Sequence, residues 1–271
     1  MDLHSGLPYW IIRNSLWDYF HPLEKDLSTD VVIVGSGITG ALMAHELCHA
    51  GIKCCIVDKR SIATGSSAAS TALLQYEIDV PLCRMAKIIG EENAATAYHA
   101  CLQSISDIKR VLEETGVNAG FEQLPSLFYA SSAADNKLLE QEHEIRQKHK
   151  LPVNLLEKKK IKEEYKVKTP GNALINEASA QMDAYRAATG LLAYHIKESG
   201  LKVFTHTSIK ECIETSDGCI MTTDRGHKIK CGYVIIATGF EAGQFLPQKI
   251  MDLTSTYALV SHPVASEHLW P

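Results

Sequence analysis

The chain has 271 residues, of which 45% are hydrophobic and 22% are charged, a balance typical of a folded globular protein. Its 27 lysines and arginines against 32 acidic residues leave a net charge of −5, which argues against electrostatic binding of nucleic acid. No apolar run approaches the roughly 20 residues that cross a bilayer, and the start of the sequence is acidic where a signal peptide carries positive charge. We therefore expect a cytoplasmic protein with neither a nucleic-acid nor a membrane partner.

The eight cysteines show no CxxC pair and no spacing of the zinc-binding type. Cys54 and Cys55 fall in an apolar run typical of a buried strand. Since disulfides are rare in the reducing cytoplasm, we expect reduced structural thiols and no metal site. His45 and His49 have the i, i+4 spacing of a metal-binding helix face, but no third ligand is evident, so packing residues are the favoured interpretation.

The predicted elements begin after an aromatic, irregular stretch at residues 1–29, which we expect to form a leader packed on the surface. Residues 30–35 (DVVIVG) are a β-branched run typical of a strand buried on both faces. A helical pattern follows at 38–50 and ends at Gly51, and residues 53–58 (KCCIVD) form a second strand. Strand, helix and strand in this order indicate a βαβ unit with parallel strands.

Further along the chain, residues 121–132 suggest one or two short strands. Residues 212–239 alternate like the strands of a hairpin, with the turn signals SDG and DRG. They end in a buried strand, YVIIATG at 233–239. Helical patterns occupy residues 81–116, 134–149 and 183–199.

The strongest motif is GSGITG at residues 35–40, a GxGxxG sequence that follows a buried strand and opens a helix. In this context backbone N–H groups and the positive end of the helix face a pyrophosphate. Gly35 permits the tight turn, Gly37 lets the phosphates approach, and Gly40 lets helix and strand pack closely. Asp58, at the end of the second strand, can accept both hydroxyls of an adenosine ribose. The motif predicts a dinucleotide site, and an ordinary glycine turn is the weaker interpretation.

The motif alone does not choose between NAD and FAD, although the Asp58 carboxylate disfavours the 2′-phosphate of NADP. Residues 65–72 (GSSAASTA) offer backbone donors to a phosphate or a flavin edge; the alternative is a flexible loop. The strand at 233–239 returns far downstream and ends in a glycine turn, which a single NAD domain does not need. Together these two stretches favour FAD.

Four stretches of the chain resemble the FAD-dependent oxidoreductases of the D-amino-acid oxidase superfamily, which includes glycine oxidase and sarcosine oxidase. They are DVVIVGSGITGALMAHELCHAGIKCCIVDKR, GSSAASTALLQ, QMDAYRAATGLLAYHIKESGLKVFTHTSI and YVIIATG. The resemblance implies an α/β fold, a Rossmann-like FAD/NAD(P)-binding domain with an inserted, incomplete α+β substrate domain. It also implies FAD as the cofactor.

The resemblance also implies cofactor contacts by position. Ile209 would bind the adenine through backbone atoms, Asp58 would bind the ribose, and Lys59 and Arg60 would lie beside the adenosine moiety. The candidate cofactor-binding residues are Gly35, Gly37, Ile38, Thr39, Gly40, Asp58, Lys59, Arg60, Ser66, Ser67, Thr71, Ala72, Ile209, Ala237, Thr238 and Gly239.

The same resemblance implies a discontinuous FAD-binding domain at residues 30–78 and 176–250, with a partial substrate domain at 79–175 and 251–271. Family members run well beyond this length, so we expect a fragment, truncated at its C-terminal end, that retains little or no FAD. An unpaired strand at 253–264 would favour self-association of the fragment.

As the function, the resemblance implies oxidation of a C–N bond of a small amine or amino acid by hydride transfer to flavin N5. The alternatives are an FAD-dependent modifier of a macromolecule, such as a tRNA base, and a nucleotide-binding module without turnover. The electron acceptor is oxygen or another protein. Tyr76, Glu77 and Asp79 are candidates for lining a substrate cavity, His206 is expected to be structural, and no catalytic residue is assigned.

Overall fold

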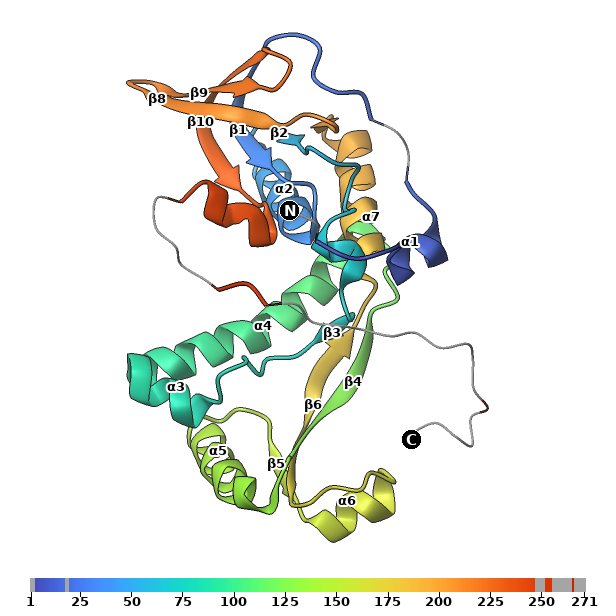
Figure 1. Ribbon diagram of the computed structural model, residues 1–271, viewed down its shortest axis with the longest axis vertical. Coiled ribbons are helices and arrows are strands. Elements are labelled where there is room, and N and C mark those ends of the chain that lie inside the picture. The colour runs from blue at the N-terminus through green and yellow to red at the C-terminus, as the bar shows by residue number, and fades with distance from the viewer. Residues whose placement is uncertain (1–2, 18–19, 247–251, 255–264, 266–271) are drawn as a thin grey trace. The chain divides into compact units, whose positions relative to one another are not determined.

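The computed structural model describes residues 3–17, 20–246, 252–254 and 265. The chain forms two compact units (Figure 1). The strand expected at residues 253–264 lies, apart from its first two residues, outside the described part of the chain. The first unit comprises Met1–Thr71, Leu112–Ala119 and Asp183–Ala258, and the second comprises Ala72–Val111, Gly120–Met182 and Leu259–Pro271.

This division differs from the expected domain boundaries. Residues 72–78 and 176–182 belong to the second unit, and residues 112–119 and 252–254 belong to the first. The reason is β6 (Ala173–Gln181), one continuous strand that pairs with other strands of the second unit along its length. A boundary at residue 176 would cut this hydrogen-bonded ladder. The functions expected of the two units stay predictions.

A six-stranded sheet forms the centre of the first unit, in the order β7-β2-β1-β10-β9-β8. β1 runs parallel to both β2 and β10, whereas β9 is antiparallel to its two neighbours. The three strands predicted from DVVIVG, KCCIVD and YVIIATG therefore share one sheet, as expected. The bounds are Leu27–Val34 for β1, Cys54–Val57 for β2, Lys202–Phe204 for β7, Ile209–Thr215 for β8, Gly218–Thr223 for β9 and Lys228–Ile236 for β10.

The central position of β1 follows from its sequence. Its last four residues, at 31–34, are all buried aliphatic side chains, as a strand covered on both faces requires. Residues 27–29 already belong to this strand, so the surface leader expected at residues 1–29 is shorter than predicted. Within that leader, Leu23 is buried in the same hydrophobic cluster as Val57 and Ile229.

Two helices of the first unit, α2 (Ile38–His49) and α7 (Ala184–Glu198), pack against each other. Asp183 caps α7 by accepting a hydrogen bond from the N–H of Arg186 at 2.9 Å. His45 on α2 and His195 on α7 are buried, and His45 Nδ1 lies 3.0 Å from His195 Nε2. His45 is thus a packing residue, as the sequence favoured. The unit also contains α1 (Tyr9–Asn14), η1 (Ser66–Ala69) and η3 (Gly239–Gln244).

The contact between the two histidines predicts sensitivity to acid. Burial, and then the neighbouring His45 and His49, lower the pKa of His195. The unfolded chain, in which histidine titrates at about 6.5, therefore takes up this proton first as the pH falls. The stabilisation is complete above that pH and is lost below it. His195→Gln is expected to reduce the loss of stability between pH 7.5 and pH 5.5, measured by urea unfolding with circular dichroism.

His227→Gln is the matched control for this experiment. His227 lies in the first unit, in the turn between β9 and β10, and is only partly buried. We expect this variant to keep the pH dependence of the parent protein. If the parent and His195→Gln lost the same stability between pH 7.5 and pH 5.5, the contact between the two histidines would not be the cause of that loss.

The second unit is built around β6, which pairs in antiparallel fashion with three strands. Its main hydrophobic cluster includes Tyr76, Leu82 and Tyr98. No helix in the described part of the chain is long and apolar enough to cross a membrane. The remaining elements are β3 (Leu73–Leu74), β4 (Glu122–Tyr129), β5 (Asn154–Leu156), α3 (Leu82–Ile89), α4 (Glu91–Thr115), η2 (Ala133–Asp135), α5 (Asn136–Lys148) and α6 (Lys158–Glu164).

A buried ion cluster lies within the second unit. Arg146 donates from Nε to Glu142 Oε1 at 2.7 Å and from Nη1 to Glu77 Oε1 at 3.1 Å. Glu142 also accepts the backbone N–H groups of Leu82 and Cys83, at 2.9 and 2.8 Å, where α3 begins. Arg146 and Glu142 are 1% and 0% exposed. One cation thus neutralises two carboxylates, and one of these carboxylates caps a helix.

Tyr76 and Glu77 belong to this cluster, so the expectation that Tyr76 lines a substrate cavity is wrong. Tyr76 is fully buried, and its hydroxyl donates to the carbonyl of Pro152 at 2.6 Å. Its ring centre lies 5.4 Å from the guanidinium carbon of Arg146. Glu77 accepts hydrogen bonds from Arg146 and from Asn176. Both side chains are therefore engaged inside the second unit.

Candidate dinucleotide site

The glycine turn at residues 35–40 joins β1 to α2. Gly35 has a φ of +112°, a conformation that favours glycine. A Cβ at Gly35 would collide with the carbonyl of Ala237, and a Cβ at Gly40 would collide with the carbonyl of Gly35. The predicted roles of Gly35 in the tight turn and of Gly40 in close packing are confirmed. Their contact with a cofactor stays a prediction.

Gly37 is the N-cap residue of α2 and lies beside η1. A Cβ at Gly37 would be 3.0 Å from Ser67 Oγ, and this oxygen accepts a hydrogen bond from the N–H of Ile38 at 2.9 Å. Ser67 therefore borders the start of α2, where the helix dipole is positive, and Ser66 precedes it as the first residue of η1. Thr39, in the first turn of this helix, is exposed.

Asp58 follows β2 directly and holds the glycine turn. Its Oδ2 accepts hydrogen bonds from the N–H of Ser36 at 2.7 Å and from the hydroxyl of Ser36 at 2.6 Å. Its Oδ1 accepts the N–H of Arg60 at 2.8 Å. Ser36 is fully buried. The sequence analysis does not identify Ser36 as a site residue, although a hydroxyl at the second position of the glycine motif could have indicated it. Both carboxylate oxygens thus hold the turn and the loop after β2, and the ribose-binding role of Asp58 stays a prediction.

Lys59 and Arg60 converge on Glu241 in η3. Lys59 Nζ lies 2.7 Å from Glu241 Oε1, and Arg60 Nη1 lies 2.8 Å from Oε2. Glu241 is 4% exposed, and the hydrogen bonds from Arg60 and Lys59 lower the pKa of its carboxyl group to about 2. Sequence reasoning missed Glu241 because it is 182 residues away from Lys59. These ion pairs join the loop after β2 to the segment after β10.

The segment before β8 also reaches the end of β2. Thr207 donates its N–H to the carbonyl of Asp58 at 2.9 Å, and His206 donates its N–H to the carbonyl of Arg60. Ile209, the predicted adenine-binding residue, begins β8 and is partly buried. The backbone bond of His206 agrees with its expected structural role.

The ATG segment at residues 237–239 borders the glycine turn from the other side. Ala237 donates its N–H to the carbonyl of Val34 at 2.8 Å, and Gly239 has a φ of +57°. Thr238 Oγ1 is buried and has no hydrogen-bond partner among the residues that the structure describes. A buried hydroxyl of this kind is costly unless a partner is supplied.

Two of the predicted cofactor-binding residues, Thr71 and Ala72, lie outside the segments described above. Thr71 is exposed and ends the first segment of the first unit. Ala72 belongs to the second unit, where its carbonyl accepts the N–H of Met182 at 2.9 Å. The other fourteen candidates all belong to the first unit, namely Gly35, Gly37, Ile38, Thr39, Gly40, Asp58, Lys59, Arg60, Ser66, Ser67, Ile209, Ala237, Thr238 and Gly239.

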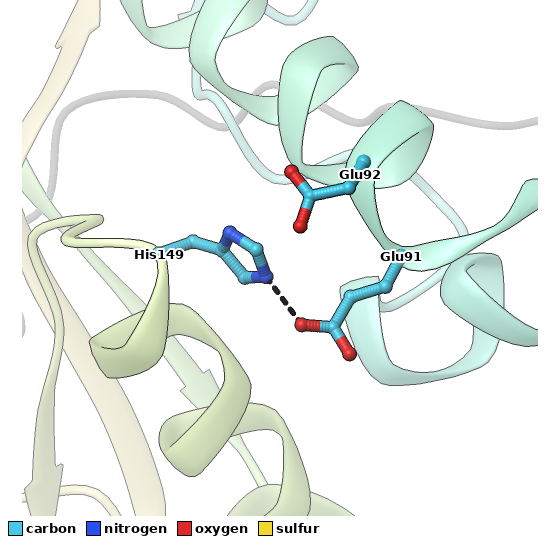
Figure 2. A group of neighbouring side chains, drawn as sticks. All are labelled: Glu91, Glu92 and His149. Carbon is cyan, nitrogen blue, oxygen red and sulfur yellow. Dashed lines mark hydrogen bonds and ion pairs between the residues drawn. The ribbon is translucent and has the colours of Figure 1, made fainter.

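The second unit contains a group of ligand types that sequence reasoning did not identify, Glu91, Glu92 and His149 (Figure 2). Their ligand atoms lie within 4.8 Å of one another. Glu91 Oε1 is already 2.7 Å from His149 Nε2 and 2.6 Å from the ammonium of Lys148. Glu91 also begins α4, where the helix dipole disfavours a cation. The group therefore functions as an ion-pair link between α4 and the end of α5.

The fold and the glycine turn define an α/β protein with a Rossmann-like dinucleotide-binding unit. Residues 30–271 match the sequence profile of the family described as FAD dependent oxidoreductase, DAO. The chain therefore belongs to this family. Family membership confirms the predicted resemblance and FAD as the cofactor.

Solved structures share this fold at low identity. L-proline dehydrogenase from P. horikoshii aligns with a TM-score of 0.65 at 23% identity, over 81% of this chain and 55% of that one. Glycine oxidase from Geobacillus kaustophilus aligns with a TM-score of 0.67 at 22% identity, over 80% and 57%. These similarities confirm the predicted fold class.

Among curated proteins, the Bacillus subtilis protein YhfW, which is named as a Rieske 2Fe-2S iron-sulfur protein, is 23% identical over 232 residues. The match covers 86% of this chain and 44% of YhfW. The chain thus spans about half the length of the proteins that it matches.

Proposed function

We propose that this protein is a flavoenzyme that oxidises a C–N bond of a small amine or amino acid. The observation that carries the proposal is the glycine turn held by Asp58, because it forms one end of a dinucleotide site in a chain of the FAD-dependent family. The names of two similar structures, a proline dehydrogenase and a glycine oxidase, support an amino-acid substrate. Nothing in these names favours modification of a macromolecule.

The residues of the first unit fit the adenosine and pyrophosphate end of FAD. The start of α2, opened by Gly37, presents N–H groups and a positive dipole to the pyrophosphate. Asp58 would accept the ribose hydroxyls, and the backbone of Ile209 would contact the adenine. Lys59 and Arg60, aligned by Glu241, would border the adenosine moiety.

Further residues would complete the cofactor site. The unpartnered hydroxyl of Thr238 supports the fit, because a bound ligand would give this buried group the hydrogen bond that it lacks. Ala237 and Gly239 accompany it along the cofactor. The remaining predicted contacts are those of Ser66, Ser67, Thr71 and Ala72.

Bound FAD supplies the acceptor for the hydride. The chain's own residues bind the cofactor and hold it in one orientation, which allows the substrate C–H bond to be positioned against it. We assign no catalytic acid or base, because loss of a hydride from a carbon that bears a neutral amine needs little proton transfer by the protein. The product imine hydrolyses in water.

For the electron acceptor we propose an iron–sulfur protein, on the basis of the name of YhfW. An iron–sulfur cluster takes one electron at a time, and ferricyanide is an acceptor of the same kind. We therefore expect the reduced flavin to reoxidise faster with ferricyanide than with oxygen. Stopped-flow measurement of flavin reoxidation tests this. Faster reoxidation by oxygen would instead assign an oxidase.

Because the fragment is expected to retain little FAD, substrate oxidation is tested by adding FAD to the protein and mixing it anaerobically with single amino acids. We expect glycine, L-proline or a related amine to bleach the visible flavin absorption. A bound flavin that no amine reduces would support a nucleotide-binding module without turnover. The cytoplasmic location and self-association stay predictions, and sedimentation velocity measures the second.

Replacing Asp58 by alanine is expected to weaken FAD binding by about 1–3 kcal/mol, the cost of leaving ribose hydroxyls without a charged acceptor. Because Asp58 also bonds to Ser36, Ser36→Ala is the matched control. It removes the bonds of the Ser36 hydroxyl to Asp58 and to the N–H of Ala63 but keeps the carboxylate, so we expect a smaller loss. Equilibrium titrations with FAD and NAD provide the measurement, and tighter binding of NAD would contradict the flavoprotein assignment.

A further inference from the structure

Two thiols meet at the end of the first βαβ unit opposite the glycine turn. Cys48 lies in the last turn of α2, Cys54 is the first residue of β2, and their sulfur atoms are 3.9 Å apart. Both residues are partly exposed. The chain between them reverses direction at Gly51, whose φ is +72°. The fold therefore holds the thiols of two partly exposed cysteines in direct contact.

Polar groups from α7 surround Cys48. Ser199, the C-cap residue of α7, forms a side-chain hydrogen bond with Cys48, and Ser199 Oγ lies 3.1 Å from His195 Nδ1. His195 in turn contacts His45. Cys48 thus has a thiol neighbour from β2 and a hydroxyl neighbour from α7, with the imidazole groups of His195 and His45 behind the hydroxyl.

These neighbours support a thiolate at Cys48. The hydrogen bond from Cys54, assisted by that from Ser199, lowers the pKa of Cys48 to about 7, although burial opposes this change. The negative end of the helix dipole at the last turn of α2 also disfavours a thiolate. The two hydrogen bonds are therefore needed to stabilise the Cys48 thiolate. By contrast, Cys212 is exposed as a residue, but the partial desolvation of its thiol raises its pKa to about 11. The thiolate is the reactive form of cysteine.

We propose that Cys48 and Cys54 are a peroxide-reactive thiol pair that closes to a disulfide. The Cys48 thiolate attacks one oxygen of hydrogen peroxide, the O–O bond breaks, and hydroxide leaves, which yields a sulfenic acid. The Cys54 sulfur then attacks the Cys48 sulfur, the S–O bond breaks, and water leaves with the Cys54 proton. In sum, two thiols and one peroxide give one disulfide and two waters.

The geometry suits this closure. A disulfide bond is about 2.05 Å long, so the sulfur atoms must approach from 3.9 Å. The reaction closes only the short turn between α2 and β2 and does not involve Asp58 at the other end of β2. The proposal is therefore independent of the proposed flavin chemistry.

The test treats the full chain with hydrogen peroxide near pH 7, followed by trypsin digestion without reductant and mass spectrometry. Cleavage after Lys53 separates the two cysteines, so the disulfide links the peptides of residues 26–53 and 54–59. Because the second peptide also contains the buried Cys55, Cys54→Ser is the decisive variant. We expect it to abolish the link and to leave a Cys48 sulfenic acid that dimedone traps.

Cys55→Ser is the matched control and should keep the link. A link that persists in Cys54→Ser, or parent protein without a link, would overturn the proposal. A second measurement follows alkylation by iodoacetamide against pH. Cys48 should react with a midpoint near 7 and Cys212 at much higher pH, and Ser199→Ala should raise the Cys48 midpoint. Equal reactivity of Cys48 and Cys212 at pH 7 would also overturn the proposal.

Discussion

Replacing Arg146 by methionine is expected to lower the free energy of unfolding of the second unit by about 3–5 kcal/mol. Methionine is long and unbranched, so it still fills space between the rings of Tyr76 and Tyr98, which lie 5.4 and 5.6 Å from the guanidinium carbon. The substitution leaves Glu142 and Glu77 without their cation. Glu142 is 0% exposed, and an unpaired carboxylate at such a position is costly.

Urea unfolding of the full chain gives the measurement. Arg110→Met is the control, because the pair of Arg110 and Asp107 is 3.5 Å apart with side chains 55% and 48% exposed, and we expect a change within about 0.5 kcal/mol. Adding Glu142→Gln to Arg146→Met should recover part of the loss, since the amide carries no charge. A loss below about 1 kcal/mol for Arg146→Met would mean that the cluster contributes little.

Replacing Gly40 by alanine is expected to abolish FAD binding and to destabilise the first unit by about 1–3 kcal/mol or more. The added Cβ would meet the carbonyl of Gly35, a backbone atom of the same turn that no side-chain rotation can move away. The turn must therefore open, and with it the contact of Gly35 with Ala237. Circular dichroism and FAD titration measure the two effects.

Gly37→Ala is the matched comparison within the same motif. Its φ of −71° suits any residue, and its Cβ would meet Ser67 Oγ, the end of a short side chain that can rotate. We expect this variant to fold normally and to bind FAD more weakly than Asp58→Ala does, because the methyl group intrudes where the backbone meets the pyrophosphate. Unfolding of Gly37→Ala, or normal FAD binding by Gly40→Ala, would contradict the assigned roles.

The sequence alone predicted the βαβ unit, the glycine turn, the position of Asp58 and the return of the 233–239 strand to the same sheet. These features depend on short-range patterns: a β-branched run, glycines at fixed offsets, and the period of a helix. Such patterns act through local backbone geometry, so they can be recognised before any tertiary contact is known. The family resemblance rests on the same local signals.

The tertiary structure decided which distant residues meet. Glu241 pairs with Lys59 and Arg60, Arg146 neutralises Glu77 and Glu142, and β6 joins the second unit rather than the first. The pair of Glu142 and Arg146 has the local i, i+4 spacing of a helix, but the other contacts have no local signature, because an isolated Glu or Arg has the same sequence context on a surface as in a core. Burial and partner are set only when separate segments pack, and packing is what gives these charges their roles.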